Sequence, residues 1–356
     1  MKRATDDDGQ NGSGDKRAKR MVVAFRGCPG NFTEAAALQH FNVSFREEVD
    51  TKGYVSFEGV FDAVKTGTDF GIVPIENSVS GTLHNVYDEL LNSSLYIVGE
   101  CSRLEEHCLC ALASTKMDSV QNIISHPAMF SQCSEFIKSL DNKLTSTSEQ
   151  QIVRQSFWDT SAACRKIVDG KLINTATICP KEAALANNLE ILQECIGNDK
   201  NNETRYLIIA KMPASKPDPL PYDRIRMKTS VAVALANVPN ALFRTVSCFG
   251  LRSINILKME SRPAITASHT VFKKEGSANP ADTTPNKKPV PIIKHWDYIF
   301  YIDFEPDMDK EVNSNLMKSL EEFTLGVRNF GTYQQNLPDV INVSSPWKGL
   351  AEISAM

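Results

Sequence analysis

Four prolines lie close together in the middle of this chain of 356 residues, at positions 213, 217, 219 and 221. Proline fixes φ and donates no backbone hydrogen bond, so this run excludes both a helix and a central strand. We interpret residues 212–226 as a linker. The chain is thereby divided into two folded units, residues 21–211 and residues 227–335, with tails over residues 1–20 and 336–356.

Short apolar stretches alternate with helical stretches before the linker. Strands are expected over residues 21–25, 70–75, 176–179 and 207–210, and helices over residues 33–40, 82–92, 128–140 and 160–168. Strands that alternate with helices are typical of α/β architecture with crossover connections. We therefore expect the first unit to be an α/β domain.

The unit after the linker follows a different order. Strands are expected over residues 229–236, 254–260, 298–304 and 327–333, and helices over residues 239–249 and 309–323. The order βαββαβ is the ferredoxin-like α+β arrangement. An insertion over residues 264–294 separates the second and third strands, and its Pro, Lys, Thr and Asn content predicts a mobile loop.

Composition excludes several classes of function. Apolar residues make up 42% of the chain and charged residues 23%, as in ordinary globular proteins. The net charge of −4 gives no general attraction to nucleic acid or anionic membranes. No apolar run approaches the ~20 residues of a membrane helix. We expect neither nucleic acid nor a membrane as a partner.

Residues 1–20 mix six basic and four acidic residues without apolar periodicity, which predicts a disordered tail. Lys2-Arg3 and Lys16-Arg17-Ala18-Lys19-Arg20 have the spacing of a bipartite nuclear-import signal, although a solvated basic tail has the same composition. The tail lacks the apolar core of a secretory signal, and Asp6–Asp8 argue against a transit peptide. We predict a cytoplasmic protein, with nuclear import as a second possibility and a plastid location less favoured.

The nine cysteines and six histidines are dispersed. Cys108 and Cys110 would face the same side of a strand, and His107 the opposite side, so no set of metal ligands is visible. Neither a Gly-x-Gly-x-x-Gly fingerprint nor a P-loop is present. We predict reduced thiols, no metal and no cofactor.

One polar run stands directly before an apolar strand, Asn202-Glu203-Thr204-Arg205-Tyr206 before residues 207–210. Arg offers a planar fork of donors to a carboxylate, and Thr offers one hydroxyl donor. The pair suits a site for a small anion. The alternative is a loop that ends in a strand, with Arg205 in a structural ion pair.

Three further segments occur with this run: residues 73–81 (Val-Pro-Ile-Glu-Asn-Ser-Val-Ser-Gly), His126-Pro127 with Gln132-Cys133, and Glu260-Ser261-Arg262-Pro263. Together with Thr204-Arg205-Tyr206 they resemble the prephenate dehydratase and arogenate dehydratase family of phenylalanine biosynthesis. The resemblance covers about residues 21–333. Two positions depart from the family pattern: Tyr206 replaces a usual Phe, with little consequence expected, and Asn240 replaces a usual Gly.

The resemblance implies a fold and a reaction. The first unit should be a two-lobed catalytic domain similar to periplasmic binding proteins, with one lobe over residues 21–98 and 180–211 and the other over residues 99–179. The second unit should be an ACT domain, a small amino-acid sensor. The family removes a hydroxyl as water and a carboxylate as carbon dioxide from arogenate or prephenate, and features of the second unit favour arogenate here.

The resemblance also implies site residues. Thr204 would donate to the leaving hydroxyl, and Arg205 would share in carboxylate binding. Free backbone N–H groups at starts of helices suit anions, so Asn77, Ser78, Gly81, Thr33, Thr160 and Ser161 are candidate substrate contacts. Thr160 and Ser161 are equally explained as helix caps. Glu76 is expected to orient Arg205, and Gln132 and Cys133 to pack in a core.

Regulation by phenylalanine is implied for the second unit. The expected effector contacts are Asn240, Ala241, Leu242, Phe243, Glu260, Ser261, Arg262 and Pro263. Asn240, in place of the usual Gly, should weaken the binding of phenylalanine. A homo-oligomer, dimer or tetramer, is expected because sensor units of this kind cover their open sheet edges. Two other functions remain: a non-catalytic sensor of aromatic metabolites, and a secreted solute-binding protein.

Overall fold

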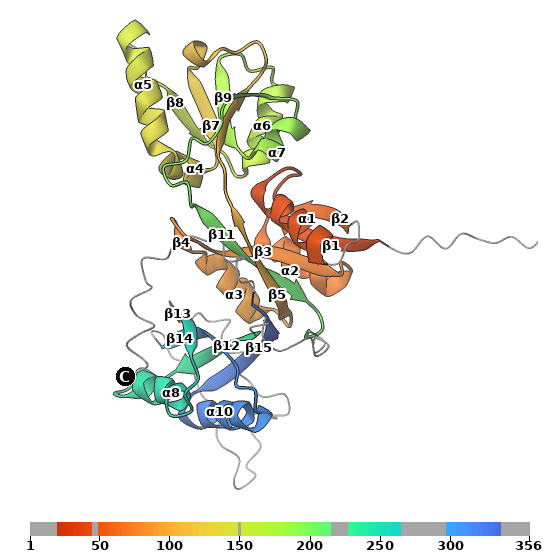
Figure 1. Cartoon of the computed structure of the whole chain (residues 1–356), viewed down its shortest axis with the longest axis vertical. Coiled ribbons are helices and arrows are strands. Elements are labelled where there is room, and N and C mark those ends of the chain that lie inside the picture. Colours follow the sequence, from red (N-terminus) through yellow and green to blue (C-terminus); the bar gives the residue numbers. More distant parts are fainter. Residues whose placement is uncertain (1–19, 45–48, 149–150, 215–226, 265–296, 336–356) are drawn as a thin grey trace, which may run out of the picture.

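The computed structural model describes residues 20–44, 49–148, 151–214, 227–264 and 297–335. Three β-sheets follow one another along the longest axis of the molecule (Figure 1). Most of the predicted N-terminal tail, linker, insertion and C-terminal tail lies outside the described residues. Among the described residues, no helix is long and apolar enough to cross a membrane.

The first lobe is built on a six-stranded sheet in the order β2-β1-β3-β11-β5, with β4 paired to β3. Its strands are β1 (Met21–Arg26), β2 (Val49–Tyr54), β3 (Phe70–Asn77), β4 (Gly81–Thr82), β5 (Tyr96–Leu104) and β11 (Glu203–Ala210), and its helices are α1 (Phe32–Ser44), α2 (Phe57–Thr66) and α3 (His84–Asn92). The amphipathic pattern of α2 buries Val60, Phe61 and Val64, and Ser56 caps its start. Strand β11 runs antiparallel between β3 and β5.

The second lobe has a five-stranded sheet in the order β10-β6-β9-β7-β8. Its elements are β6 (Cys108–Ala111), η1 (Met117–Ser119), β7 (Asn122–Ser125), α4 (Pro127–Gln132), α5 (Ser134–Ser148), β8 (Val153–Ser156), α6 (Thr160–Asp169), β9 (Thr175–Cys179), α7 (Lys181–Ala186) and β10 (Glu190–Gln193). The helix predicted over residues 128–140 is interrupted at Cys133, where α4 ends and α5 begins. At the end of α4, the side chain of Gln132 contacts the first lobe.

The predicted lobe boundaries require correction. Strand β5 stays in the first sheet as far as Leu104, paired with β11. Strand β10 pairs with β6 in the second sheet, and Ala183, Ala184 and Leu189 pack with Cys110 in the second core. Residues 180–193 therefore belong to the second lobe, because their apolar side chains are buried there. The chain crosses between the lobes near residues 105–107 and 194–202.

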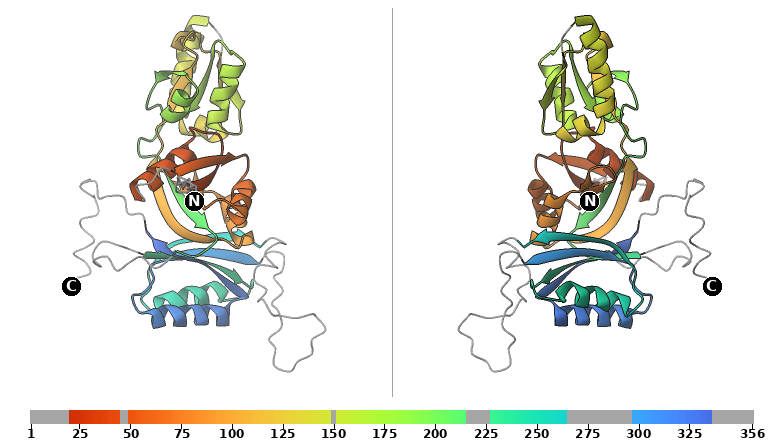
Figure 2. Two further views of the ribbon diagram at one scale, coloured as in Figure 1. Left: turned by 90° about the vertical axis from the view of Figure 1, so that its right-hand side faces the viewer. Right: turned by 90° about the vertical axis from the view of Figure 1, so that its left-hand side faces the viewer.

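The C-terminal unit is a four-stranded antiparallel sheet in the order β13-β14-β12-β15. Its elements are β12 (Met227–Leu235), α8 (Ala241–Gly250), β13 (Ile256–Pro263), β14 (Tyr298–Phe304), α10 (Lys310–Phe323) and β15 (Gly326–Gln334). This confirms the predicted ferredoxin-like order. Both helices cover the outer face of the sheet (Figure 2).

The inner face of the C-terminal sheet packs on the first lobe (Figure 2). Tyr301 and Phe330 share one buried core with Leu90 and Ile97 of the first lobe. Gly331 has φ +128°, and a Cβ there would lie 2.7 Å from the carbonyl oxygen of Ile97. The close approach of these two units therefore needs glycine at this position.

Candidate active site

Thr204 lies near the start of β11 and is only 4% exposed. Its neighbours in the sheet register are Asn77 of β3 and Arg103 of β5. The Thr204 Oγ1 accepts a hydrogen bond from Asn77 Nδ2 (2.8 Å) and donates one to Glu105 Oε1 (2.7 Å). The predicted hydroxyl is therefore the centre of a buried polar group at the junction of the two lobes.

Asn77 closes the turn that follows β3. Its Oδ1 accepts hydrogen bonds from the backbone N–H groups of Val79 (3.0 Å) and Ser80 (2.8 Å), and its Nδ2 donates to Asn202 Oδ1 (2.7 Å). The backbone N–H of Ser78 donates to the Glu203 carbonyl at 2.8 Å. The N–H groups that the sequence offered to an anion are therefore already occupied, which corrects that prediction.

Ser78 and Gly81 have structural roles in this turn. The Ser78 Oγ accepts a hydrogen bond from the Glu203 N–H at 2.9 Å and so joins the turn to β11. Gly81 has φ +79°, and a Cβ there would meet nothing within 4 Å. The left-handed backbone, rather than a close approach to a ligand, explains this glycine.

Gln132 brings the second lobe into the site. Its Nε2 donates to Ser80 Oγ (3.0 Å) and to Asn77 Oδ1 (3.3 Å), and its Oε1 lies 2.7 Å from His107 Nε2. The prediction that Gln132 packs in a core is wrong, whereas Cys133 is buried in the second lobe as predicted. Gln132 is the last residue of α4. Because one continuous helix was predicted over residues 128–140, nothing in the sequence indicated that this side chain lies at a helix end.

His107 lies in the same group and was not predicted as a site residue. It is 1% exposed, and burial lowers its pKa, which favours the neutral ring. Its Nε2 is 3.3 Å from Asn202 Nδ2, and its Nδ1 is buried without a hydrogen-bond partner. Because Gln132 Oε1 can only accept, Nε2 donates to it, so His107 holds Gln132 at the crossover between the lobes and Asn202 lies beside the ring.

Glu105 was also missed by the sequence analysis, because it follows β5 in a run that resembles an ordinary polar loop. Its Oε1 accepts hydrogen bonds from Thr204 and from the Tyr206 hydroxyl (3.2 Å). Burial raises the pKa of Glu105, and this effect outweighs the two hydrogen bonds and the charge of Arg103, which lower it. The Tyr206 hydroxyl, expected to have little consequence, is thus part of the site.

Arg205 leaves β11 on the opposite face from Thr204. Its guanidinium contacts Glu100 (3.0 Å), Glu76 (3.2 Å) and Asp303 (3.4 Å). Successive side chains of a strand point to opposite faces, so Arg205 faces the C-terminal unit. Arg205 therefore makes the structural ion pairs of the alternative interpretation, including the predicted pair with Glu76, and lies on the face away from Thr204.

Arg103 is the guanidinium on the same face as Thr204. Its Nη2 forms an ion pair with Glu182 Oε1 of α7 in the second lobe. Its Nη1 is buried and makes no hydrogen bond. A buried donor without a partner is costly unless a ligand or water satisfies it, so Arg103 is the cation placed to receive a carboxylate.

Residues at the start of α6 contact the first lobe across the junction between the lobes. Asp159 Oδ1 caps α6 by accepting from the Ala162 N–H (2.8 Å), and its Oδ2 accepts from Asn31 Nδ2 of the first lobe (2.9 Å). Ser161 Oγ donates to the Pro29 carbonyl oxygen across the same junction. Asp159, rather than Thr160 or Ser161, is thus the cap of α6, and Ser161 contacts the first lobe.

Thr33 and Thr160 are 9% and 6% exposed at the starts of α1 and α6. At the start of α1 the Glu34 N–H donates to Asn31 Oδ1 at 2.9 Å, and the preceding Gly30 N–H donates to Glu34 Oε2 at 2.5 Å. These two threonines remain candidate substrate contacts after separation of the lobes.

The predicted effector residues divide into two groups. Asn240 has φ 66° and ψ 5° directly before α8, a left-handed conformation that explains a usual glycine there. Ala241 is partly buried against the core of the C-terminal unit, and Leu242 and Phe243 are exposed.

The other group lies on β13. Glu260 Oε2 accepts from Thr82 Oγ1 (2.8 Å), and Arg262 pairs with Asp88, so both side chains face the first lobe. Ser261 and Pro263 are exposed on this strand. The expectation that Glu260 and Arg262 face the effector is therefore corrected: the first lobe engages both.

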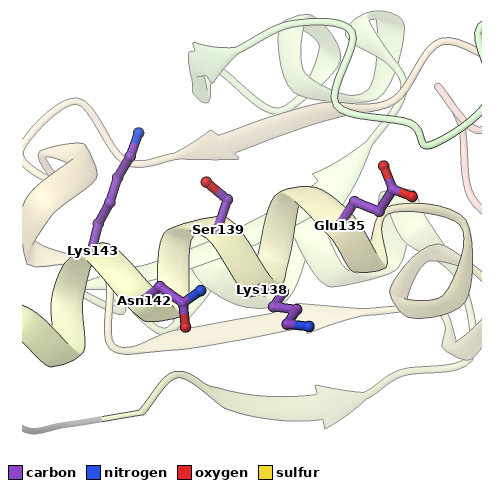
Figure 3. Close-up of a pocket in the computed structure, with 5 residues that line it drawn as sticks. All are labelled: Glu135, Lys138, Ser139, Asn142 and Lys143. Atoms are coloured by element: carbon purple, nitrogen blue, oxygen red, sulfur yellow. The ribbon is translucent and has the colours of Figure 1, made fainter.

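Two further features do not belong to this site. A shallow hollow of about 520 Å³ on the outer face of α5 is lined by exposed polar side chains (Figure 3): Glu135, Lys138, Ser139, Asn142 and Lys143. Within the described ranges, no group of three or more His, Cys, Asp or Glu side chains lies close enough to hold a metal ion.

The fold and the site define a class: a two-lobed α/β protein with a buried hydroxyl between its lobes, fused to a ferredoxin-like unit. The family model for prephenate dehydratase matches residues 23–214. Arogenate dehydratase/prephenate dehydratase 1, chloroplastic, of Arabidopsis thaliana is 34% identical over 326 residues, which cover 91% of this chain and 75% of that protein. The chain therefore belongs to the prephenate dehydratase family.

One further relative agrees with this assignment, and one solved structure shares the fold. Arogenate dehydratase 2 of Petunia hybrida is 30% identical over 315 residues, or 88% of this chain and 72% of that protein. The prephenate dehydratase of Arthrobacter aurescens, solved in complex with L-Phe, has a TM-score of 0.70 at 22% identity and covers 94% of this chain and 97% of its own. The second likeness concerns the fold.

Proposed function

We propose that this chain dehydrates and decarboxylates arogenate, prephenate or both, to give phenylalanine or phenylpyruvate. The observation that carries the proposal is Thr204, whose hydroxyl is held between Asn77 and Glu105 at the lobe junction. Relatives that this chain matches over most of its length are named for the same two activities. The names of these relatives favour an enzyme over the non-catalytic sensor.

The reaction requires the protein to bind the substrate carboxylate and to donate a hydrogen bond to the leaving hydroxyl. Departing carbon dioxide leaves its bonding electron pair to the ring, and aromatisation drives the loss of the hydroxyl. Thr204 supplies a hydrogen bond to that hydroxyl in a site from which water is excluded, where such a bond is most effective. Arg103 replaces Arg205 in our proposal as the anchor for a substrate carboxylate, since its Nη1 is the unpartnered donor beside Thr204.

Substrate entry requires separation of the lobes. In the closed arrangement Arg103 is paired with Glu182, Gln132 with Asn77, and Asp159 with Asn31, each across the junction. The two crossovers near residues 105–107 and 194–202 are the connections that such a motion would bend. Thr33, Thr160 and Ser161 would then face the space between the lobes.

The choice between arogenate and prephenate depends on an amine or a keto group in the side chain. We infer arogenate with some prephenate activity. The test gives the purified full chain each substrate and measures phenylalanine and phenylpyruvate, with Thr204→Val as the background. A larger kcat/KM for prephenate reverses the preference, and no product above background with either substrate would favour the sensor.

We also propose that the C-terminal unit is an ACT domain that binds phenylalanine as a feedback effector. Its ferredoxin-like topology supports the proposal, as does the Arthrobacter protein that was solved with L-Phe. The exposed Leu242 and Phe243 at the start of α8 are suited to the effector's ring. Titration calorimetry with phenylalanine on the full chain tests binding, with tyrosine as the comparison ligand.

A homo-oligomer, dimer or tetramer, remains our prediction. Strand β13 lies at one edge of the C-terminal sheet, and its Met259 is 44% exposed. An open edge strand favours pairing with another copy. Light scattering should give a dimer or tetramer mass, and a monomer both with and without phenylalanine would contradict the prediction.

The compartment also remains a prediction. Relatives from Arabidopsis are named as chloroplastic, which strengthens the plastid alternative relative to the sequence analysis. The basic segments of the proposed nuclear-import signal fall almost wholly outside the described residues. A fluorescent fusion to the C-terminus of the full chain distinguishes cytoplasm, nucleus and plastid.

A further inference from the structure

The hydrogen of the Thr204 hydroxyl is directed at Glu105. A hydroxyl has one hydrogen and two acceptor lone pairs. Asn77 Nδ2 donates to one lone pair of Oγ1, while the hydroxyl hydrogen is donated to Glu105 Oε1 at 2.7 Å. The proposed function needs this hydrogen for the leaving hydroxyl. With an ionised Glu105, therefore, Thr204 is not ready to act.

A protonated Glu105 removes this conflict. A protonated carboxyl can donate its own hydrogen to the remaining lone pair of Thr204 Oγ1. The oxygen then accepts from Asn77 and Glu105 and keeps its hydrogen free for the substrate. All three hydrogen-bonding positions of the hydroxyl are satisfied in this state.

The surroundings of Glu105 suit the protonated form. The titratable and charged groups that face it are Tyr206 of β11, with Cys101 beside that ring, and Arg103 of β5. Arg103 is itself paired with Glu182 of α7. Within the described part of the chain no cation forms an ion pair with Glu105, and burial acts against its charge more strongly than the hydrogen bonds and Arg103 favour it.

We propose that protonated Glu105 is the proton source for the reaction and acts through the hydroxyl of Thr204. Glu105 is thus a positioning residue, and Thr204 is the catalytic residue. The inference rests on the proposed function. It also gives a role to Tyr206, which stands where the family usually has Phe.

The proton transfers balance as follows. The bond to the departing carboxylate breaks and its electron pair enters the ring, while the carbon–oxygen bond to the ring hydroxyl breaks. The leaving oxygen takes the hydrogen of Thr204 and departs as water. Thr204 takes the proton of Glu105, which ends ionised and recovers a proton from solvent before the next turnover.

The first test measures kcat against pH for wild type and Glu105→Gln. The wild-type kcat should fall as pH rises and Glu105 ionises, with an apparent pKa above the ordinary glutamate value of about 4.3. Glu105→Gln keeps a donor to Thr204 but supplies no proton, so kcat should fall by roughly 10²–10⁴-fold, KM should change little, and the alkaline limb should vanish. An unchanged kcat with the same limb overturns the proposal.

The second test measures the same pH dependence of kcat in Tyr206→Phe, which removes one hydrogen bond to Glu105 and keeps Glu105 itself. The Tyr206 hydroxyl stabilises the ionised carboxylate, so its removal should move the alkaline limb of kcat to higher pH. A purely structural role for Glu105 predicts a lower kcat at every pH with the limb in place. That result, or a shift to lower pH, overturns the proposal.

A third measurement does not depend on turnover. At a pH below the alkaline limb of the wild-type kcat, the infrared band of one protonated carboxyl should be present in wild type and absent in Glu105→Gln. Turnover by wild type without such a band overturns the role of Glu105 alone. A band without turnover on either substrate overturns the proposed function, and with it the role of Glu105 in that reaction.

Discussion

Thr204 and Arg205 are consecutive in β11, yet their side chains join different parts of the molecule. The Thr204 Oγ1 lies 2.7 Å from Glu105 at the lobe junction, whereas the Arg205 guanidinium lies 3.4 Å from Asp303 of the C-terminal unit. The alternation of a strand places the candidate site on one face and the interface with the C-terminal unit on the other. A rotation of the C-terminal unit that displaces Asp303 would therefore break its ion pair with Arg205, the residue next to Thr204.

The contacts around Arg205 form a buried ionic network. Glu100, whose side chain is 1% exposed, receives Arg205 and Lys228, the latter at 2.8 Å. Asp303 Oδ1 accepts from Ser230 Oγ at 2.6 Å. Buried charges of this kind are tolerated when all are paired and become costly when one partner is removed.

Thr204→Val should remove most turnover and leave the fold intact. Valine has the shape of threonine without the hydroxyl, so the donor to the leaving group is lost. We expect kcat to fall roughly 10²–10⁴-fold. Thr204→Ser is the control and should keep much of the activity. If purified Thr204→Val keeps more than about a third of the wild-type kcat, a loss far smaller than general-acid catalysis predicts, Thr204 is not the donor.

Arg103→Met should weaken substrate binding. A charge-assisted hydrogen bond contributes about 1.5–3 kcal/mol, so kcat/KM should fall roughly 10–150-fold. Glu182→Gln is the matched variant, because it releases Arg103 from its partner in the second lobe and should lower KM. If Arg103→Met leaves kcat/KM unchanged, another group anchors the carboxylate.

Arg205→Met should affect stability and regulation more than substrate binding. Removal of this guanidinium leaves Glu100 and Asp303 short of a partner, at an expected cost of about 3–5 kcal/mol in the free energy of unfolding. Urea unfolding measures this cost, and the response of activity to phenylalanine should weaken. A large rise in KM with unchanged stability would return Arg205 to the substrate site.

Acid should loosen the contact between the first lobe and the C-terminal unit. Burial alone would raise the pKa of Glu76, but the hydrogen bond from Lys258 and the charge of Arg205 lower it. A lowered folded-state pKa stabilises the fold above the unfolded value of about 4.3, and this contribution is lost as pH falls through the folded pKa.

The melting temperatures of wild type and Glu76→Gln, measured against pH, test this. The two curves should lie apart near neutral pH and converge in acid. Parallel curves over the whole range would show that Glu76 does not contribute to the pH dependence.

The sequence predicted the α/β and ferredoxin-like units, the main strands and the central place of Thr204, because these follow from local periodicity and from motifs in one segment. It did not predict Arg103, Glu105 or His107, whose roles depend on which strands are neighbours in the sheet. Arg205 was assigned to the wrong face because adjacency in sequence was taken as adjacency in space. Gln132 was given a packing role because the break between α4 and α5 at Cys133 was not expected.

Asn240→Gly should strengthen inhibition by phenylalanine. Asn240 occupies a left-handed conformation directly before α8, where glycine adds no side chain beside the free N–H groups. If the carboxylate of phenylalanine binds there, the variant should lower the inhibition constant by about two- to fivefold, the worth of a charge at a helix start.

Asn240→Ala is the control for this position. It keeps a side chain in an unfavourable conformation, so it should destabilise the unit by about 1–2 kcal/mol without improving inhibition. Titration of activity with phenylalanine in all three proteins decides the matter. Equal inhibition constants in wild type and Asn240→Gly would show that this residue does not tune the effector site. An absence of binding in every variant would show that the C-terminal unit does not sense phenylalanine.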